Sequence, residues 1–277
     1  MIPWQGHVHL LQQASPPLQP SAADLEFIQH WIDRQSALLA MRGETALRVL
    51  ILGATRQYHD LRWPPQTRLL AVDYAQAILD SVWPGPVDTT LCTNWLALTP
   101  AHGRFHLVLG DGCLCQLNWP EQHTALVKML HRVLLPAALV LTRAFVLAER
   151  NENFAEALQA QQSAKHASTS QVKLRFWLAA QPSPETGIQP RACWQQLQAS
   201  VPNQQQLAAA LGLCAADVQL LVDQYQQSDE RRFHYATQAM ITDLFCRQPG
   251  GFHLEAEYFP SYPLGQHCPS FALRYKG

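Results

Sequence analysis

One short segment constrains the fold of this chain more than any other: a nearly continuous apolar run that ends at a glycine. The run covers residues 46–52, and Gly53 follows it directly. Continuous hydrophobicity over so few residues is typical of a strand that helices cover on both faces, as in a parallel sheet. We therefore predict an α/β protein in which Gly53 forms a tight turn at the carboxyl end of a central strand.

Strands and helices alternate around this segment. Apolar runs predict further strands at residues 68–72, 89–92, 105–109 and 138–145. Helical spacing of apolar residues predicts helices at residues 21–43, 75–83 and 121–134. Ser21 and Asp24 form a capping box at the start of the first helix, and Pro136 ends the last one. This order predicts a doubly wound, mostly parallel sheet, which binds ligands at the carboxyl ends of its strands.

The second half of the chain has a different pattern. Glutamine and alanine become frequent after Glu149, and helices are predicted at residues 172–180, 191–200, 204–211, 215–227 and 237–247. Strand patterns return at 252–259 and 270–275, so we interpret the helical block as an insertion before a closing β-hairpin of a seven-stranded sheet. The expected parts are an N-terminal arm and helix (1–44), an α/β core (45–148), a helical lid or substrate region (149–250) and the hairpin (251–277).

Charge and cysteine content exclude several classes of protein. The 277 residues include 20 Lys and Arg against 21 Asp and Glu, scattered along the chain, which argues against a nucleic-acid partner. Seven cysteines, an odd number without a C-x-x-C pair, favour a reducing cytoplasm over a disulfide framework or a zinc ribbon. The longest apolar stretch, residues 133–146, is shorter than the ~20 residues that span a membrane. We expect a cytoplasmic protein with a small-molecule substrate and no membrane partner, and leave open whether it forms a homo-oligomer.

Polar and glycine residues follow several of the predicted strands. Asp73 ends the second strand 20 residues after Gly53, the interval at which a carboxylate can accept hydrogen bonds from both hydroxyls of a ribose. Asn94 and Trp95 follow the third strand, and the Gly-Asp-Gly sequence of residues 110–112 follows the fourth. These positions favour a nucleoside site over the alternative of ordinary turns, a solvated aspartate and a core tryptophan.

Taken in this order, residues 49–55, 72–73, 94–95 and 105–112 resemble the class I S-adenosylmethionine-dependent methyltransferases, in particular a bacterial branch of that family. Residues 131–136 are similar to the family's junction between helix and fifth strand, and residues 252–275 to its terminal antiparallel hairpin. The resemblance implies a Rossmann-like fold, S-adenosylmethionine as co-substrate, and methyl transfer to an acceptor held beneath the insertion.

The resemblance also assigns roles by position in the motifs. Gly53 and the residue after it would lie along the methionine and ribose of S-adenosylmethionine, and Asp73 would hold the ribose hydroxyls. Asn94 and Trp95 would flank the adenine, while Asp111 would face the methionine. The full set assigned to cofactor binding is Gly53, Ala54, Thr55, Asp73, Tyr74, Asn94, Trp95, Gly110, Asp111 and Gly112.

Other residues support weaker hypotheses, and none is assigned as catalytic. His59, next to an aspartate, could act as a base, with a simple turn residue as the alternative. Tyr225 and Tyr235, in an aromatic group of the insertion, could bind substrate or pack the insertion onto the sheet. We interpret Cys113 and Cys115 as core thiols and expect no metal.

The first glycine motif departs from the family pattern. It has one glycine, Gly53, in place of G-x-G-x-G, and Ile51 stands where the family has an acidic residue. Arg56 adds a cation near the expected sulfonium, which is unfavourable unless the side chain points to solvent or pairs with a carboxylate. Two other functions therefore stay open: a non-catalytic S-adenosylmethionine-binding or interaction module, and an NAD-dependent oxidoreductase, since Asp73 would hold either ribose.

Overall fold

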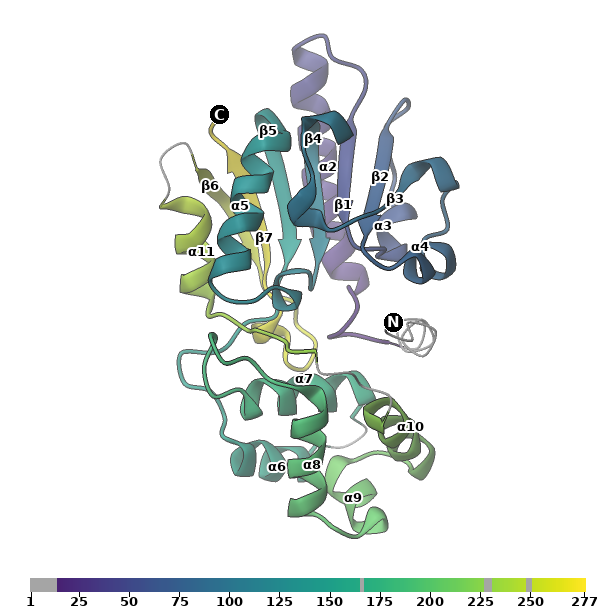
Figure 1. The fold of residues 1–277 in the computed structure, drawn as a ribbon, viewed down its shortest axis with the longest axis vertical. Helices are drawn as coiled ribbons and strands as arrows, with labels where there is room; N and C mark the ends of the chain where they lie inside the picture. Colours follow the sequence, from purple (N-terminus) through teal and green to yellow (C-terminus); the bar gives the residue numbers. More distant parts are fainter. Residues whose placement is uncertain (1–13, 165–166, 227–230, 248–250) are drawn as a thin grey trace.

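A seven-stranded β-sheet forms the centre of the computed structural model, which describes residues 14–164, 167–226, 231–247 and 251–277, with the backbone alone for Gln204 and residues 224–226 (Figure 1). The strands are β1 (Arg48–Leu52), β2 (Arg68–Asp73), β3 (Thr90–Cys92), β4 (Phe105–Asp111), β5 (Leu134–Arg143), β6 (Phe252–Tyr258) and β7 (Ser270–Tyr275). Their order is β3-β2-β1-β4-β5-β7-β6. Strands β1 to β5 are parallel, and β7 is antiparallel to β5 and β6. The predicted doubly wound sheet with its closing antiparallel hairpin is confirmed.

Helices cover both faces of the sheet because successive residues of a strand point to opposite sides. One face packs against α2 (Ala22–Met41), α3 (Arg56–His59) and α4 (Gln76–Val82). The other face packs against α5 (Glu121–Val133) and α11 (Gln238–Cys246). In β1, Val49 and Ile51 belong to the first apolar layer, and Leu50 and Leu52 belong to the second. This burial on both sides explains the continuous hydrophobicity of the strand.

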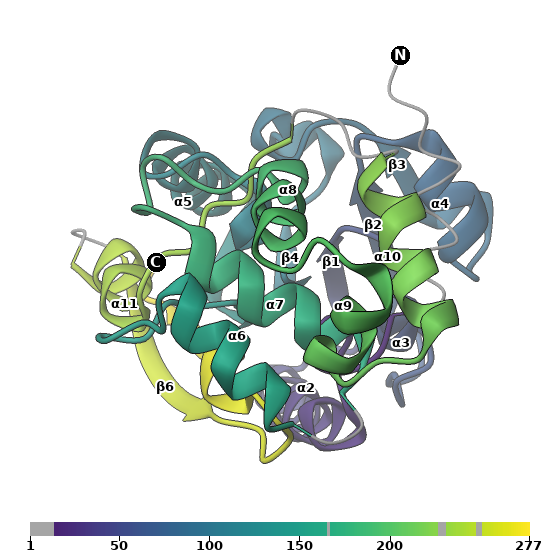
Figure 2. The same cartoon turned by 90° about the horizontal axis from the view of Figure 1, so that it is seen from below.

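Five helices form a separate cluster beneath the carboxyl ends of the strands (Figure 1). They are α6 (Phe154–Gln162), α7 (Thr169–Ala180), α8 (Pro190–Ser200), α9 (Gln204–Leu211) and α10 (Ala215–Gln226). Seen from below, α7 lies in the middle of the cluster with the other four around it (Figure 2). The cluster has its own apolar core, which includes Phe176, Trp194 and Leu221. The connections also contain short 3-10 turns at Val87–Thr89, Trp95–Ala97, Pro100–His102, Leu114–Gln116 and Gly265–His267.

Several boundaries differ from those that the sequence predicts. The sequence pattern did not identify α6, and α11, which we expected within the insertion, packs against α5 and β6 through Ile241 and Phe245. Pro136 does not separate α5 from the fifth strand, because β5 begins at Leu134 and contains Pro136. The pairing of β5 with β4 is irregular there, and Ala137 has a φ of 58°.

Gln35 of α2 stabilises this irregular stretch of β5 from the neighbouring layer. Its fully buried Nε2 donates to the Ala137 carbonyl of β5 over 3.3 Å and to the His106 carbonyl of β4 over 3.2 Å. Arg274 of β7 donates to the Gln35 Oε1 atom and, over 2.9 Å, to the same Ala137 carbonyl. One helical side chain therefore supplies hydrogen bonds to two backbone carbonyls where the pairing of β4 and β5 is irregular.

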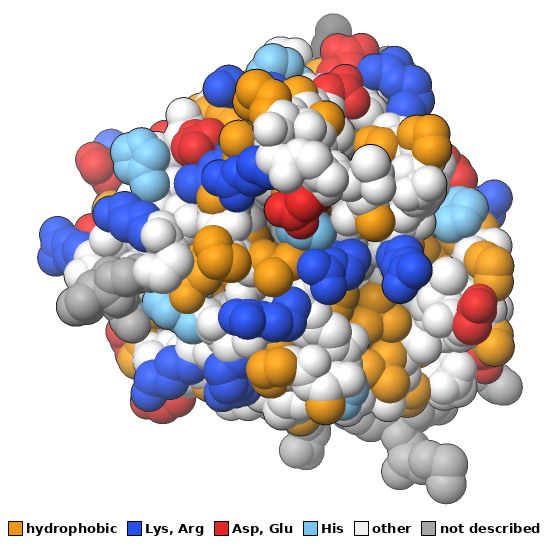
Figure 3. Space-filling view, turned by 90° about the horizontal axis from the view of Figure 1, so that it is seen from above, with side chains coloured by type: hydrophobic (Ala, Val, Ile, Leu, Met, Phe, Trp, Pro, Cys, Tyr) orange, Lys and Arg blue, Asp and Glu red, His pale blue; other side chains and the backbone are white. Residues whose placement is uncertain are grey.

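The face opposite the helical cluster shows Lys and Arg side chains spread among hydrophobic and acidic ones (Figure 3). Within the described residues, no single helix is long and apolar enough to cross a membrane. One bent pair of helix segments, Gln205–Leu211 with Ala215–Asp223, passes that test by length and composition, with an angle of 99° between them.

Replacing Gln35 by Leu tests its role in the fold. The substitution removes the donor to two buried carbonyls and the acceptor of Arg274, so we expect the free energy of unfolding in urea to fall by about 2–3 kcal/mol. Gln195→Leu, on an exposed face of α8, is the matched control and should change stability by less than about 0.5 kcal/mol. Equal effects of the two substitutions would contradict the role given to Gln35.

Candidate functional site

Gly53 ends β1 at the carboxyl edge of the sheet, beside the residue that ends β2. Because Leu52 pairs with Val72, Gly53 and Asp73 are neighbours at the ends of adjacent parallel strands. The Gly53 amide donates to the Val72 carbonyl over 2.8 Å, and its φ of 96° lies in the left-handed range that favours glycine. A Cβ added at Gly53 would lie 3.9 Å from the Trp95 ring, an ordinary contact. The backbone conformation, rather than crowding, is therefore what requires a glycine.

Asp73 presents a half-buried carboxylate at this edge. Its Oδ1 accepts the Ala75 amide over 2.9 Å, which fixes the orientation of the carboxylate. Burial raises the pKa of Asp73, while the amides of Ala75 and Tyr74 and the charge of Arg231 oppose that rise. Arg231 lies in the segment that follows the helical cluster in the chain. Tyr74 itself is 50% exposed.

The turn after Gly53 leads directly into α3. Ala54 is buried, and Thr55 is a half-buried N-cap residue that makes no side-chain cap bond. The Arg56 side chain is exposed to solvent. Water weakens the interaction of an exposed charge with its surroundings, so the Arg56 cation does not repel a cation bound at this edge as a buried charge would.

The loop after β3 contributes Asn94 and Trp95. The exposed Asn94 side chain accepts the Leu96 amide over 2.9 Å and so begins the short helix that follows. Trp95 is buried, and its indole N–H donates to the Val72 carbonyl over 2.6 Å. The indole nitrogen already has a partner, so Trp95 offers apolar ring surface next to Gly53. The assignment of both residues to the adenine stays a prediction.

A buried ion pair lies at the ends of β4 and β5. The Arg143 guanidinium is fully buried, and its Nε donates to the Asp111 Oδ1 atom over 2.6 Å. Burial raises the pKa of Asp111, and the neighbouring guanidinium opposes that rise. Asp111 raises the pKa of Arg143 in turn, despite the desolvation of the guanidinium. The sequence indicated Asp111 but not its partner; the only signal was an arginine within the apolar run of β5.

The same guanidinium holds two other segments at the site. Its Nη1 donates to the Pro17 carbonyl over 2.6 Å and to the Tyr262 hydroxyl over 3.1 Å. Its carbon Cζ lies 5.1 Å from the centre of the Phe145 ring. Among the described residues, the buried Nη2 of Arg143 has no hydrogen-bond partner. The segment before α2 and the connection between β6 and β7 therefore meet at one side chain.

A second buried carboxylate, Asp24, lies near this ion pair. Its Oδ2 accepts the Ser21 amide and the Ser21 hydroxyl, each over 2.7 Å, which confirms the predicted capping box of α2. Its negative charge contributes to raising the pKa values of Asp111 and Tyr58. The fully buried Tyr58 hydroxyl donates to the Gly110 carbonyl over 3.4 Å. The ends of α2 and α3 thus reach the edge formed by β4.

Packing explains the two glycines that flank Asp111. A Cβ at Gly110 would lie 2.6 Å from the Cys113 Sγ atom, and one at Gly112, whose φ is 59°, would lie 2.7 Å from the Phe145 ring. Cys113 and Cys115 are both buried, as we expected for core thiols. Burial raises the pKa of Cys113 to about 12, so that its thiol stays protonated at neutral pH.

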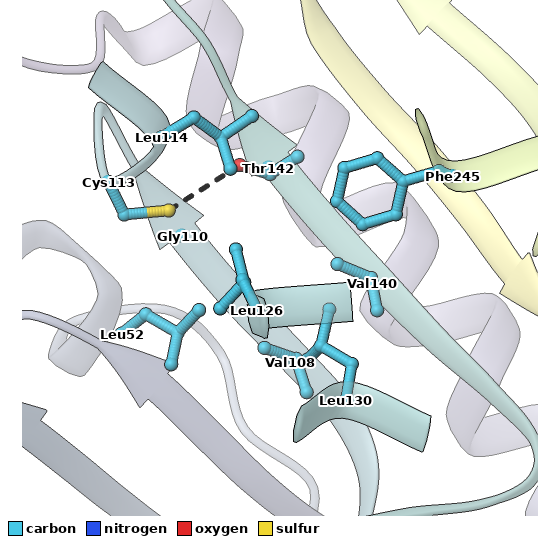
Figure 4. Close-up of a pocket in the computed structure, with 10 residues that line it drawn as sticks. All are labelled: Leu52, Val108, Gly110, Cys113, Leu114, Leu126, Leu130, Val140, Thr142 and Phe245. Carbon is cyan, nitrogen blue, oxygen red and sulfur yellow. Dashed lines mark hydrogen bonds between the residues drawn. The ribbon is translucent and has the colours of Figure 1, made fainter. Parts of the chain in front are cut away.

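A small apolar cavity lies behind Gly110, between the sheet and the helices α5 and α11 (Figure 4). It is lined by Leu52, Val108, Gly110, Cys113, Leu114, Leu126, Leu130, Val140, Thr142 and Phe245. The polar side-chain atoms of this lining are the Thr142 hydroxyl and the Cys113 thiol, 3.9 Å apart. This cavity is unsuited to a charged nucleoside, because a buried polar group without partners is unfavourable.

The structure describes the surroundings of His59 and Tyr235, two of the residues with weaker hypotheses. The His59 Nδ1 atom lies 3.1 Å from Asp60 Oδ1, and its ring packs edge-on against Trp83 at 5.3 Å. Tyr235 is buried in the core of the helical cluster, as the packing alternative predicts. The side chain of Tyr225, and the N-terminal residues 1–13, lie outside the described part of the chain.

The segment that returns from the helical cluster to the sheet touches the loop after β4. The His234 amide donates to the Cys115 carbonyl over 2.9 Å. The buried His123 of α5 lies near this contact: its Nδ1 is 3.2 Å from the Asn118 carbonyl, and its ring packs against Trp119 at 4.9 Å. The pKa of His123 is lowered to about 4, mainly by burial, and the charge of His234 contributes to the lowering.

Comparisons with known proteins identify the fold. No family model matches the chain, and no curated protein matches its sequence at a significant level. The N-methyltransferase NodS from Bradyrhizobium japonicum WM9, solved with S-adenosyl-L-homocysteine, superposes with a TM-score of 0.50 at 10% identity, over 100% of each chain. The plantazolicin methyltransferase BpumL, solved with a triazolic desmethylPZN analogue and the same nucleoside, gives 0.50 at 10% identity, over 99% of this chain and 92% of BpumL. The chain has the Rossmann-like fold of these methyltransferases.

Another structure of this fold has a different description. It is a putative zinc-dependent alcohol dehydrogenase from Rhodobacter sphaeroides, with a TM-score of 0.56 at 14% identity, over 98% of this chain and 96% of that one. In the part of the chain that the structure describes, no three His, Cys, Asp or Glu side chains lie close enough together to hold a metal ion. At such low identity all three likenesses concern the fold, and the function must be argued from the site.

Replacing Arg143 by Met tests the buried ion pair. The substitution leaves the Asp111 carboxylate buried without its counter-ion, so the free energy of unfolding in urea should fall by about 3–5 kcal/mol. Combining it with Asp111→Asn removes the unpaired charge and should recover part of that loss. Arg247→Met, which breaks an exposed ion pair with Asp243, is the control and should lower stability by less than about 1 kcal/mol. A loss no larger than that of the control would contradict the role of Arg143.

The pKa of His123 predicts how stability depends on pH. An unfolded histidine titrates near 6.5 and folded His123 near 4, so the unfolded chain binds more protons below pH 6.5. Its contribution is fully present above pH 6.5 and is lost as the pH falls towards 4, by about 3 kcal/mol. His123→Gln should flatten the pH profile of urea unfolding in this range, and the exposed control His30→Gln should not. An unchanged profile in His123→Gln would show that another group titrates.

Proposed function

We propose that this protein is an S-adenosylmethionine-dependent methyltransferase whose donor binds at the carboxyl edge of β1 and β2. The observation that carries the proposal is the placement of Gly53 and Asp73 side by side at the ends of two paired parallel strands. The crevice outside the carboxyl ends of the strands is where open α/β sheets bind their ligands. Sequence motifs, strand order and the methyltransferase structures of the same fold all support this assignment.

The residues present fit a nucleoside donor. Asp73 has one oxygen oriented by the Ala75 amide, so the carboxylate is positioned to accept the two hydroxyls of a ribose. The positive φ of Gly53 turns the chain away from β1 without a side chain in the turn. The Arg56 side chain is exposed to solvent, so its charge interacts only weakly with a cation bound at this edge. Asn94 would meet the adenine from the neighbouring loop, as the resemblance implies.

Little chemical assistance is needed from the protein for such a transfer. When bound, the donor supplies a methyl group on a sulfonium, which is already a good leaving group. The acceptor atom forms its bond to the methyl carbon as the bond to sulfur breaks, and the acceptor then loses a proton to solvent where it carried one. The protein must align the two molecules and exclude water. The segment held by Arg143 and the helical cluster lie where they would cover the reacting groups.

We propose a small molecule as the acceptor. A net charge of −1, with cations and anions interspersed, gives no attraction to a nucleic-acid backbone. The helical cluster lies beneath the carboxyl edge of the sheet, where a ligand of that edge would meet it. Cys113 is protonated and Asp111 is bound to Arg143, so neither is assigned as a general base.

Calorimetric titration tests the proposal. We expect S-adenosylmethionine and S-adenosylhomocysteine to bind with micromolar dissociation constants and NAD not to bind. Asp73→Ala should abolish binding, and Asp73→Asn, which keeps an acceptor for the Ala75 amide, should weaken it at least about tenfold because the carboxylate charge is lost. Asp88→Asn, an exposed carboxyl near β3, is the matched control and should bind normally.

The other outcomes distinguish the alternatives. No binding of either S-adenosyl compound contradicts the proposal, and binding of NAD alone supports the oxidoreductase. If S-adenosylmethionine binds, its conversion to S-adenosylhomocysteine in the presence of fractionated small molecules separates an enzyme from a binding module. Conversion that depends on one fraction and is lost in Asp73→Ala supports the enzyme.

A further inference from the structure

The segment that precedes α2 passes between the sheet and the helical cluster (Figure 1, purple). We call residues 14–20 the strap. Within it, the Leu18 and Gln19 amides donate to the Ser15 carbonyl over 2.9 and 3.2 Å, which forms a compact turn. Pro17 is buried, and the Leu18 side chain packs against the apolar core of the helical cluster. The strap is therefore folded and packed, although it contains no helix or strand.

Three ties connect the strap to three different parts of the protein. At one end, the Ser15 amide donates to the buried Ser170 hydroxyl of α7 over 3.1 Å. In the middle, the Arg143 guanidinium at the end of β5 donates to a strap carbonyl over 2.6 Å. Towards the other end, the Gln57 side chain of α3 donates to the Gln19 side chain over 2.9 Å. The strap thus joins the helical cluster to both sides of the carboxyl edge.

The path of the strap crosses the point where the strand order of the sheet reverses. Helix α3, which holds one end of the strap, follows β1 directly, and Arg143 ends β5. In the order β3-β2-β1-β4-β5, strand β4 lies between these two attachments. The chain leaves β1 towards β2 on one side, while β4 lies on the other, and this is the crevice in which open α/β sheets bind their ligands. A ligand of that crevice would therefore meet the strap.

Buried polar atoms without partners accompany these ties. Among the described residues, the Arg143 Nη2, the Asp24 Oδ1 and the Ser270 hydroxyl are buried and form no hydrogen bond. Arg143 and Ser270 are opposite each other in the pairing of β5 with β7, so their side chains lie on the same face of the sheet. Asp24 binds Ser21, the residue that follows the strap. All three atoms thus belong to side chains at or beside the attachments of the strap.

We propose that the strap is a gate at the carboxyl edge, which leaves Arg143 to admit a ligand to the crevice beside β1 and β4 and then returns over it. The proposal rests on the proposed function for the identity of that ligand, which is S-adenosylmethionine. The gate opens as a unit, because its turn is held by bonds within the strap itself.

The energetic balance of the closed strap favours such movement. A buried polar atom without a partner is unfavourable, because it has lost its water and gained no hydrogen bond in return. In the closed position, the strap gains its three ties but keeps water from the Arg143 guanidinium. Opening breaks the ties and lets water reach the unpaired atoms, so that the two effects offset each other. The strap therefore opens without unfolding of the sheet.

NMR-detected hydrogen exchange tests this opening. In the free protein, the Ser15, Leu18 and Gln19 amides should exchange together and much faster than the amides of β4, at a rate that low concentrations of urea leave unchanged. S-adenosylhomocysteine at about 100 times its dissociation constant should slow their exchange at least about tenfold. The Thr67 amide, in a turn before β2 at the opposite edge of the sheet, is the control and should not respond.

Binding kinetics provide a second readout. Ser170→Ala removes one tie of the strap and touches none of the residues assigned to the donor. By stopped-flow fluorescence, it should raise both the association and the dissociation rate constants of S-adenosylhomocysteine at least about threefold, because a gate must open for entry and for release. Ser200→Ala, which removes an exposed hydroxyl from α8, is the matched control and should leave both rate constants unchanged.

The outcomes separate this proposal from the proposed function. Strap amides that exchange only as slowly as those of β4 would overturn the gate, as would exchange that bound S-adenosylhomocysteine leaves unchanged. Unaltered rate constants in Ser170→Ala would also overturn it. If S-adenosylhomocysteine does not bind at all, the proposed function fails, and exchange in the free protein still decides whether the strap opens as a unit.

Discussion

The buried ion pair between Arg143 and Asp111 is the interaction on which the arrangement of the site depends. A fully buried guanidinium is tolerated only when it has hydrogen-bond acceptors, and Arg143 takes these from three places in the chain. Asp111 comes from β4, Pro17 from the segment before α2, and Tyr262 from the connection between β6 and β7, while Arg143 itself ends β5. The buried charge of Arg143 therefore holds the segment before α2 and the connection between β6 and β7 at the carboxyl ends of β4 and β5.

Charges of both signs act at the carboxyl edge of the sheet. The sheet contributes two carboxylates, Asp73 and Asp111, whose pKa values burial raises. Arg231 supplies a positive charge that acts on Asp73, and the Arg143 guanidinium pairs with Asp111. S-adenosylmethionine carries a sulfonium, an ammonium and a carboxylate, so a site with separated positive and negative groups suits such a ligand. Apolar surface such as the Trp95 ring, next to Gly53, adds contact area without adding charge.

Much of this architecture follows from local sequence pattern. The apolar run before Gly53 and the 20-residue interval to Asp73 were enough to predict the central strands and the edge at which they end, because burial on both faces requires continuous hydrophobicity. The capping box at Ser21 was predicted for the same reason: it joins residues three positions apart. Local chemistry determines these features, so the sequence displays them directly.

The features that the sequence did not reveal depend on contacts between distant segments. Arg143 appeared only as an interruption of an apolar run, since Pro17 lies 126 positions away from it. Pro136 was expected to delimit β5, but Gln35 and Arg274 supply partners for the irregular backbone beside it. The spacing of apolar residues in the sequence identifies helices and strands, whereas contacts between distant segments determine which charged side chains face each other.

The measurement that tests the central claim most directly is a crystal structure of the protein with S-adenosylhomocysteine. The account predicts the nucleoside at the carboxyl ends of β1 and β2, with both ribose hydroxyls within hydrogen-bond distance of the Asp73 carboxylate and the ribose passing over Gly53. A nucleoside bound elsewhere, or one whose ribose does not contact Asp73, would contradict the account.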